Sequence, residues 1–307
     1  MPERVWVITG TNSGFGLAIA RYALAQGDKV IGTVRSLEKF PASLKDFSAQ
    51  PIVLDLNDSD ETLKQAAESA IRIYGRVDVL VNNAGTNSAI GPVEELKLDN
   101  IRRQFQENLF GIVAFTQPFI AHFRVRRSGH IINISSMASH MNHPSLGAYC
   151  ASKSAIDSFS ESLAKEVSMF GVRVHIIEPG YFPTNIFVTH PNYTPGNASL
   201  QHVPVAPGLS KIYTDTAQGY NVLNIMPRMG EATGRVGDVD VLARRVYEVV
   251  TDTGMARELE VNERPRLRIP LGSDSGEGIS SSLKAAIENH QAIEPIWRST
   301  DIKRAKL

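Results

Sequence analysis

The sequence predicts an α/β protein with a doubly wound parallel sheet, because short β-branched segments alternate with segments of helical periodicity. The apolar segments are nearly continuous hydrophobic runs, which is typical of strands covered on both faces. The last of them contains a proline and therefore suits an edge strand. The predicted strands are 5–9, 29–34, 51–54, 77–81, 130–134, 172–177 and 267–271, and the helical patterns include 17–26, 61–74 and 99–123. Such sheets bind ligands beyond the C-terminal ends of their strands.

Composition and charge argue against several classes of protein. Among the 307 residues, 32 are Lys or Arg and 32 are Asp or Glu, so the formal net charge is zero. This balance argues against a nucleic acid or an anionic membrane as the main partner. The single cysteine, Cys150, excludes an internal disulfide and fits a reducing compartment. No apolar run reaches membrane-spanning length, and the first one is too short for a signal peptide, so we expect a cytoplasmic protein.

The last three residues suggest a second compartment. Ala305, Lys306 and Leu307 are similar to the Ser-Lys-Leu signal that directs proteins to peroxisomes. Matches of three residues often arise by chance, and the alternative is a solvated basic tail.

A glycine-rich segment between the first strand and the first helix is suited to bind the phosphates of a dinucleotide. The glycines permit a tight turn and close approach of the backbone, and the helix start offers N–H groups and a positive dipole to a pyrophosphate. The alternative is a purely structural turn, but the strand before and the helix after favour a phosphate loop. The predicted cofactor contacts are Gly10, Thr11, Asn12, Ser13, Gly14, Phe15 and Gly16.

The end of the second strand indicates which dinucleotide binds. NAD-binding units commonly carry an Asp or Glu there, which holds the ribose 2′-hydroxyl. Here no carboxylate occupies that place, and Arg35 offers a guanidinium that suits a 2′-phosphate. We therefore predict NADP(H) as the cofactor, the alternative being that Arg35 is an exposed loop charge. Asp55 and Leu56, after the third strand, are predicted to meet the adenine, although Asp55 could instead be a helix N-cap.

Several short motifs, in matching order and spacing, resemble the short-chain dehydrogenase/reductase family over nearly the whole chain. They are Thr9-Gly10 with Gly14 and Gly16, Asn82-Asn83-Ala84-Gly85, Asn108 within ENLFG, NISS at 133–136, Tyr149-x-x-x-Lys153 and EPGYFPT at 178–184. The resemblance implies a single Rossmann-like domain over 1–307 with about seven parallel strands. It also implies a homodimer or homotetramer.

The resemblance assigns catalysis to Asn108, Ser136, Tyr149 and Lys153. Tyr149 and Lys153 are one helical turn apart, so a cation beside a phenol would favour the phenolate, although alone they could be an ordinary exposed pair. Both are also predicted to contact the cofactor, Lys153 through the nicotinamide ribose. Ser136 ends the fifth strand, where its hydroxyl would hold the substrate oxygen as charge develops. Asn108 would fix a water that relays protons through Lys153, unless it only bonds a neighbouring backbone group.

Two further segments are similar to the family's cofactor-binding loops. After the fourth strand, Asn82, Ala84 and Gly85 would let the backbone approach the cofactor, although Asn82 could mainly tie neighbouring strands together. After the sixth strand, a hydroxyl resembles the one that binds the nicotinamide carboxamide, its alternative being a cap of a short helix. The residues predicted in this second segment are Pro179, Gly180, Phe182 and Thr184, the last of which carries that hydroxyl.

The remaining segments are predicted to modify access to the site. The segment 187–237 is rich in Pro, Gly, Asn and Thr and follows the sixth strand, so we predict a lid over the ligand cleft, and 273–307 is a variable C-terminal extension. His140 and His143 could line the substrate entrance, but the sequence shows no second His, Cys or Asp set near them. We therefore predict no metal. Cys150 points off the face of the catalytic tyrosine and is interpreted as a small core thiol.

Together these residues predict an NADP(H)-dependent oxidoreductase that interconverts a ketone or aldehyde with an alcohol. The uncharged to apolar character of 187–237 favours a medium to bulky hydrophobic substrate. One alternative is an enzyme of the same fold that oxidises alcohols with NAD or reduces C=C or C=N bonds. Another is a non-catalytic NADP(H)-binding regulator, against which the complete Ser, Tyr, Lys and Asn set argues.

Overall fold

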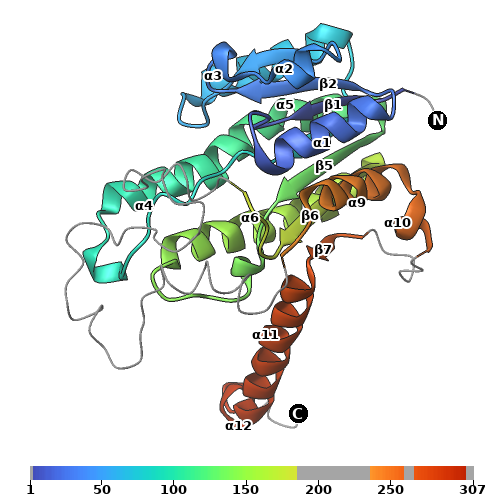
Figure 1. The fold of residues 1–307 in the computed structure, drawn as a ribbon. Helices are drawn as coiled ribbons and strands as arrows, with labels where there is room; N and C mark the ends of the chain where they lie inside the picture. Colours follow the sequence, from blue (N-terminus) through green and yellow to red (C-terminus); the bar gives the residue numbers. More distant parts are fainter. Residues whose placement is uncertain (1–2, 185–235, 259–265, 302–307) are drawn as a thin grey trace.

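A computed structural model of the protein describes residues 3–184, 236–258 and 266–301. At its centre lies a sheet of seven parallel strands in the order β3-β2-β1-β4-β5-β6-β7 (Figure 1). The strands are β1 (Val5–Ile8), β2 (Lys29–Val34), β3 (Gln50–Val53), β4 (Val79–Asn82), β5 (Gly129–Ile134), β6 (Val172–Pro179) and β7 (Arg268–Leu271). The predicted Rossmann-like, doubly wound sheet is confirmed. Strand order reverses between β1 and β4, which opens a crevice at their C-terminal ends.

Helices cover both faces of the sheet and bury two separate hydrophobic cores. One face is covered by α1 (Gly14–Ala25), α2 (Ala42–Lys45) and α9 (Val239–Thr251), and the other by α3 (Asp60–Tyr74), α5 (Gly111–Arg126) and α6 (Gly147–Val167). Strand β1 contributes side chains to both cores: Trp6 and Ile8 belong to the first, and Val5 and Val7 to the second. Successive side chains of a strand point to opposite faces, which explains why this strand is apolar throughout.

The helical pattern predicted over 99–123 contains an irregularity that the sequence does not reveal. Helix α4 (Leu98–Phe105) continues into a π-helical turn, η3 (Gln106–Phe110), before α5 begins. Such turns are frequent at functional sites. A β-carbon on Gly111 would lie 2.4 Å from the Leu56 carbonyl oxygen, so this glycine lets the start of α5 pack closely on the loop after β3. The π-helical turn carries the predicted site residue Asn108, which is fully buried.

The described chain ends in helices beyond the last strand. Helix α11 (Ser273–Ala292) follows β7 and projects away from the sheet, with α12 (Glu294–Arg298) at its far end (Figure 1). The short helix α10 (Gly254–Glu258) follows α9. In the described part of the chain, no helix is both long enough and apolar enough to cross a bilayer. The predicted lid lies outside the described residues except for its last two positions.

Candidate active site

A cavity of about 450 Å³ opens at the C-terminal ends of the central strands. It brings together residues that are predicted from segments far apart in the sequence. The predicted residues that line it are Gly10, Asn12, Ser13, Gly14, Phe15, Arg35, Asp55, Leu56, Ala84, Gly85, Ser136, Tyr149, Lys153, Pro179, Gly180, Phe182 and Thr184. Four other predicted residues, Thr11, Gly16, Asn82 and Asn108, are not part of this lining.

The glycine-rich loop has a geometry suited to an anion. Gly10 and Gly14 adopt positive φ angles of 71° and 56°, which side chains other than glycine rarely adopt. A β-carbon on Gly16 would lie 2.3 Å from the Gly10 carbonyl oxygen, so α1 can approach the loop only with glycine there. Ser13 stands at the N-cap of α1 without a side-chain capping bond, and the first turn holds no acidic residue. The positive end of the helix therefore faces the cavity without a side-chain anion.

Thr11 supports this loop from behind. Its backbone N–H and its hydroxyl both donate to the Thr33 carbonyl of β2, at 3.0 and 3.2 Å. Both residues are almost completely buried. The structure thus places the Thr11 side chain between the loop and the sheet.

The part of the cavity lining that holds Arg35 contains a second basic residue that the sequence reasoning missed. Lys39 lines the cavity together with Arg35, and both side chains are exposed. Its distance of four residues from Arg35 in the sequence could have indicated it. Asp55 forms an Asx turn, since its Oδ1 accepts from the backbone N–H and the side-chain amide of Asn57 at 3.0 and 2.9 Å. The N-cap of α3 is Ser59 instead.

Tyr149, Lys153 and Ser136 form one wall of the cavity. Helix α6 carries the tyrosine and the lysine one turn apart, and both side chains are less than 8% exposed. The Lys153 ammonium donates to the Ile134 carbonyl oxygen at 2.8 Å, which ties α6 to the end of β5. Ser136 follows β5 and begins the 3₁₀ turn η4 (Met137–Ser139), where its Oγ accepts from the Ala138 backbone N–H at 3.1 Å.

Burial dominates the proton affinities of this pair. It raises the pKa of Tyr149 to about 12, against the effect of a hydrogen bond with Ser136. It lowers the pKa of Lys153 to about 8, against the attraction of the Asp157 carboxylate. In the chain by itself, desolvation of the phenolate is therefore the largest influence on the pKa of Tyr149, and the effect of the lysine on the phenol stays a prediction. The protonated phenol is the stable form at neutral pH.

Asn108 is held behind the wall by a complete set of hydrogen bonds. Its Oδ1 accepts from the Thr86 backbone N–H at 2.9 Å, and its Nδ2 donates to the Thr86 carbonyl at 2.9 Å and to Ser152 Oγ at 3.1 Å. A β-carbon on Gly85 would lie 3.2 Å from Asn108 Oδ1 and 3.6 Å from Lys153 Nζ. The side chains of the asparagine and the lysine thus both lie close to the backbone at Gly85.

The two asparagines at the C-terminal end of β4, Asn82 and Asn83, have different surroundings. The Asn82 amide donates to Asn133 Oδ1 at 2.8 Å and to Thr116 Oγ1 at 3.0 Å, which joins β4 to β5 as the alternative interpretation expected. Asn83, which was not singled out, lines the cavity and donates to the Thr9 and Gly10 carbonyls at 2.8 and 3.2 Å. Its position in the motif Asn82-Asn83-Ala84-Gly85 could have indicated that it lines the cavity.

The loop after β6 packs against the glycine-rich loop and the start of α1. Phe182 packs edge-to-face on Phe15, with ring centres 5.1 Å apart. The Thr184 side chain lies 3.6 Å from the position of a β-carbon on Gly14. The backbone N–H of Tyr181 donates to Asp274 Oδ2 at 2.6 Å, so the start of α11 holds this loop in place.

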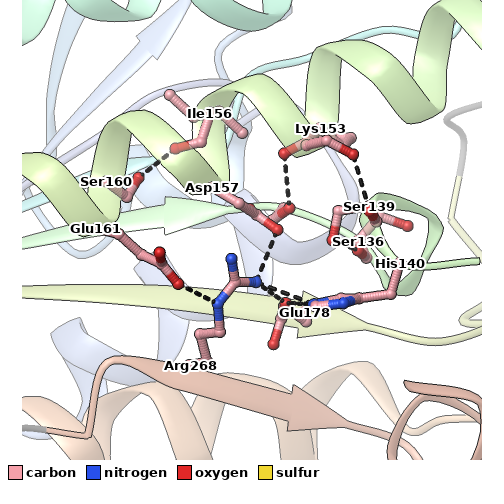
Figure 2. Close-up of polar contacts among 12 residues, drawn as sticks. Ser136, Ser139, His140, Lys153, Ile156, Asp157, Ser160, Glu161, Glu178 and Arg268 are labelled. Atoms are coloured by element: carbon pink, nitrogen blue, oxygen red, sulfur yellow. Dashed lines mark hydrogen bonds and ion pairs between the residues drawn. The ribbon is translucent and has the colours of Figure 1, made fainter. Parts of the chain in front are cut away.

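The two histidines that follow Ser136, His140 and His143, have different surroundings. His143 lines the cavity. His140 instead faces two buried carboxylates, Asp157 and Glu178, so the expectation that no such set lies near it is wrong (Figure 2). The set was hidden because its members come from the loop before α6, from α6 itself and from β6. Arg268 already provides a cation for this cluster, because its Nη1 lies within 3.0 Å of an atom of each of these three side chains.

Cys150 is a buried free thiol whose pKa is raised by burial.

Comparison with known proteins matches this architecture to one family. The model of the short chain dehydrogenases matches residues 4–192, which include the glycine-rich loop and the Tyr149 and Lys153 pair. The chain belongs to the short-chain dehydrogenase family. A crystal structure of a short-chain dehydrogenase from Streptomyces avermitilis superimposes with a TM-score of 0.79 and 32% identity, covering 98% of this chain and 100% of that one.

Two curated members of the family show how far sequence similarity extends. The chain is 38% identical over 186 residues to oxidoreductase BOA17 of Botryotinia fuckeliana, a match that covers 59% of this chain and 67% of that protein. It is 36% identical over 184 residues to the 3-ketodihydrosphingosine reductase of Bacteroides thetaiotaomicron, covering 60% of this chain and 66% of that protein. The matches thus span about two thirds of each relative. As a short-chain dehydrogenase, the protein is an oxidoreductase that uses NAD(H) or NADP(H).

Proposed function

We propose that the protein is an NADP(H)-dependent reductase that converts a ketone or aldehyde to an alcohol. The observation that carries this proposal is that Ser136, Tyr149 and Lys153 line the same cavity as the glycine-rich loop. The Tyr149 phenol, whose pKa burial raises to about 12, is protonated at neutral pH, and this is the form that donates a proton to a carbonyl oxygen.

The residues of the cavity fit a nicotinamide dinucleotide. The N-terminus of α1 and the loop at Gly10 and Gly14 would hold the pyrophosphate, and Gly85 leaves room beside Lys153 for the nicotinamide ribose. Thr184 would bind the carboxamide. The bound dinucleotide would supply the hydride.

The polar residues of the wall have separate roles in this proposal. Ser136 orients the carbonyl oxygen and stabilises the negative charge that develops on it. Tyr149 donates the proton to that oxygen, and Lys153 holds its charge beside the phenol. Asn108, fixed by Thr86 and Ser152, supports the path along which protons pass between solvent and Lys153.

The preference for NADP(H) rests on two basic side chains. Arg35 and Lys39 both line the adenosine end of the cavity, and no carboxylate ends β2. A 2′-phosphate would gain two charge-assisted contacts there, whereas a 2′-hydroxyl would leave both cations unpaired by the ligand. One relative, 34% identical over 189 residues, is named an NADPH-dependent 3-dehydrocapnine reductase of Ornithobacterium rhinotracheale.

A medium to bulky hydrophobic carbonyl compound is the proposed substrate class. Apolar side chains next to Ser136 and Tyr149 line the cavity, among them Met137 and Leu146. The name of the Bacteroides relative also denotes a ketone reductase. We further propose that 187–237 forms the substrate lid and that the protein acts as a homodimer or homotetramer in the cytoplasm. Light scattering and localisation of the tagged protein test the last two points.

The decisive experiment is a rate screen of NADPH oxidation across aldehydes, simple ketones, steroids and quinones. The proposal expects turnover with at least one hydrophobic carbonyl and a lower rate with NADH. Binding of NADPH without turnover of any carbonyl would favour a non-catalytic role, and turnover restricted to alcohols with NAD would reverse the assigned direction. The same screen with C=C and C=N substrates separates the remaining alternative.

A further inference from the structure

A partly buried ion cluster lies beside the catalytic wall, and we call it the Arg268 cluster. It contains Arg268 from β7, Asp157 and Glu161 from α6, Glu178 from β6 and His140 from the loop before α6. Arg268 Nη1 lies 3.0 Å from Asp157 Oδ2 and 2.6 Å from Glu178 Oε1, and its Nε lies 2.7 Å from Glu161 Oε1. His140 Nε2 lies 2.9 Å from Glu178 Oε1. Figure 2 shows these side chains converging on the guanidinium.

The cluster is connected to the turn that carries the catalytic serine. This turn spans 136–140, from Ser136 to the cluster member His140. It is fixed from within by Ser139 Oγ, which donates to the Ser136 carbonyl at 2.9 Å, and from α6 by Ser154 Oγ, which donates to the Ser139 carbonyl at 2.8 Å. From α11, Ser282 Oγ donates to the His140 carbonyl at 2.8 Å. The turn is therefore held between α6 and the C-terminal segment.

The cluster also reaches the catalytic helix. Asp157 lies one turn after Lys153 and two turns after Tyr149, so all three side chains share one face of α6. Each of the three is at most 7% exposed. At this depth the carboxylate acts on both groups: it favours the Lys153 ammonium and disfavours the Tyr149 phenolate.

Stability alone does not account for the cluster. Asp157 and Glu178 are 2% and 1% exposed, and within the described structure each keeps one carboxylate oxygen without a hydrogen-bond partner. Burial raises the pKa of Glu178 even though Arg268 is in contact with it. Incompletely paired buried carboxylates cost free energy, and hydrophobic side chains in the same volume are often at least as stable. A role in the neighbouring site explains why so much charge is buried here.

We propose that Arg268 and Asp157 are positioning residues for the active site. Arg268 holds the turn 136–140 against α6 and thereby fixes the Ser136 hydroxyl relative to Tyr149. Asp157 links this cluster to Lys153 and sets the proton affinity of the Tyr149 and Lys153 pair. The proposal rests on the proposed carbonyl reduction and adds to it a function for the C-terminal segment, from which Arg268 and Ser282 come.

The first test compares Arg268→Met with Arg266→Met. Arg266 is a matched control, because it lies two residues earlier and pairs with Asp252, whose side chain is 56% exposed. We expect kcat for carbonyl reduction to fall about tenfold in R268M, while the Kd for NADPH changes less than about twofold. Hydrogen exchange of the amides in 136–141 should become faster in R268M and not in R266M. If R268M does not fold, Ser282→Ala removes a single bond to the same turn and should give the same pattern more weakly.

The second test compares Asp157→Asn with Glu166→Gln, which removes an exposed carboxylate from the same helix. Loss of the Asp157 charge lowers the pKa of both Tyr149 and Lys153, so the alkaline limb of kcat for reduction should move down by about half a pH unit or more. Both variants keep the other titratable groups near the pair, which are His143 and Glu107 in the cavity lining, Cys150 on α6, and Glu178, His140 and Arg268 in the cluster. Of these, Glu178 and Arg268 also interact with the Asp157 carboxylate, which raises the pKa of each. E166Q should leave the limb in place.

The outcomes separate this proposal from the proposed function. An unchanged exchange rate at 136–141 in R268M, or an equal loss of activity in R268M and R266M, contradicts the role of Arg268. An unshifted pH profile in D157N contradicts the role of Asp157. If the unmodified protein reduces no carbonyl, the proposed function fails, whereas the exchange comparison still decides whether Arg268 holds the serine turn.

Discussion

The Lys153 ammonium lies 5.8 Å from the centre of the Tyr149 ring while it donates to the backbone carbonyl of Ile134. The position of the Lys153 ammonium relative to the phenol is therefore fixed by a hydrogen bond, unlike that of a lysine on the surface. It is anchored at the end of β5, beside the turn that starts with Ser136. Helix α6 thus supplies the two side chains, and the sheet fixes the position of one of them.

Tyr149→Phe tests the assigned proton donor. Removal of the hydroxyl should lower kcat for carbonyl reduction by about 10²- to 10⁴-fold, because the proton must then come from water. Since the ring remains, NADPH binding and the melting temperature should change little. Steady-state kinetics with a substrate found in the screen measures the effect, and Tyr74→Phe, outside the cavity lining, is the control. Equal rates for Y149F and Y74F would remove Tyr149 from the mechanism.

Arg35→Ala and Lys39→Ala test the cofactor preference. Each charge-assisted contact to a phosphate contributes roughly 1.5–3 kcal/mol, so either variant should weaken NADPH binding by about tenfold or more. NADH binding should change less than about twofold, since the 2′-hydroxyl makes no such contact. Fluorescence titration with both nucleotides gives the two constants, and Lys45→Ala, an exposed lysine on α2, serves as the control. Parallel losses for NADPH and NADH would contradict the NADP(H) assignment.

Gly16→Ala tests the close approach of α1 to the phosphate loop. The new β-carbon would lie 2.3 Å from the Gly10 carbonyl and 2.5 Å from Asn83 Nδ2, so the loop must move. We expect a loss of about 1–3 kcal/mol in unfolding free energy and weaker cofactor binding. Gly276→Ala in α11, where a β-carbon meets no atom within 4 Å, should be neutral or slightly stabilising. Denaturant unfolding of both variants measures the difference, and equal stabilities would show that the loop accommodates the methyl group.

A pair of histidines, the half-buried His130 and the buried His175, predicts how stability depends on pH. His130 Nδ1 and His175 Nε2 are 3.3 Å apart, and His175 Nδ1 donates to the Arg266 carbonyl at 2.7 Å. Burial lowers the pKa of His130 to about 3 and that of His175 to about 4. The unfolded chain therefore binds more protons below its ordinary histidine pKa of about 6.5, and stability falls as the pH decreases from there toward about 4.

Urea unfolding at about pH 7 and about pH 4.5 measures this dependence. We expect the free energy of unfolding to be lower at the acidic pH by on the order of 3 kcal/mol. His130→Gln should reduce the difference between the two pH values, and His290→Gln on the exposed part of α11 should not. A difference that is the same in H130Q as in the unmodified protein would exclude the pair as its cause.

Much of the fold could be predicted because it is encoded locally. Each β-branched run became a strand close to its predicted bounds, and the seven-stranded parallel sheet followed from their alternation with helices. Many of the predicted site residues likewise line one cavity, because each lies at the C-terminal end of a strand or at the start of a helix. The π-helical turn around Asn108 could not be predicted, since it depends on packing against the loop at Thr86 and not on a local pattern.

Two features of the site could not be predicted from sequence spacing. They are the burial that raises the pKa of Tyr149 and the acidic neighbours of His140, which the sequence reasoning wrongly excluded. Sequence spacing reports only the neighbours within one helix or strand. Burial of the phenol, and the approach of Glu178 and Arg268 from two other strands, depend on contacts between distant segments.

The sequence by itself determined the fold class, the phosphate loop and the spacing of Tyr149 and Lys153, because strand periodicity, glycine positions and helical repeat are local properties. Only the tertiary structure decided which of these residues face the cavity and what charge surrounds them. It turned Asn82 toward Asn133, placed Lys39 and Arg35 in the lining of one cavity and placed Arg268 between Asp157 and Glu178. The physical reason is that desolvation and ion pairing depend on atoms close in space, whatever their separation along the chain.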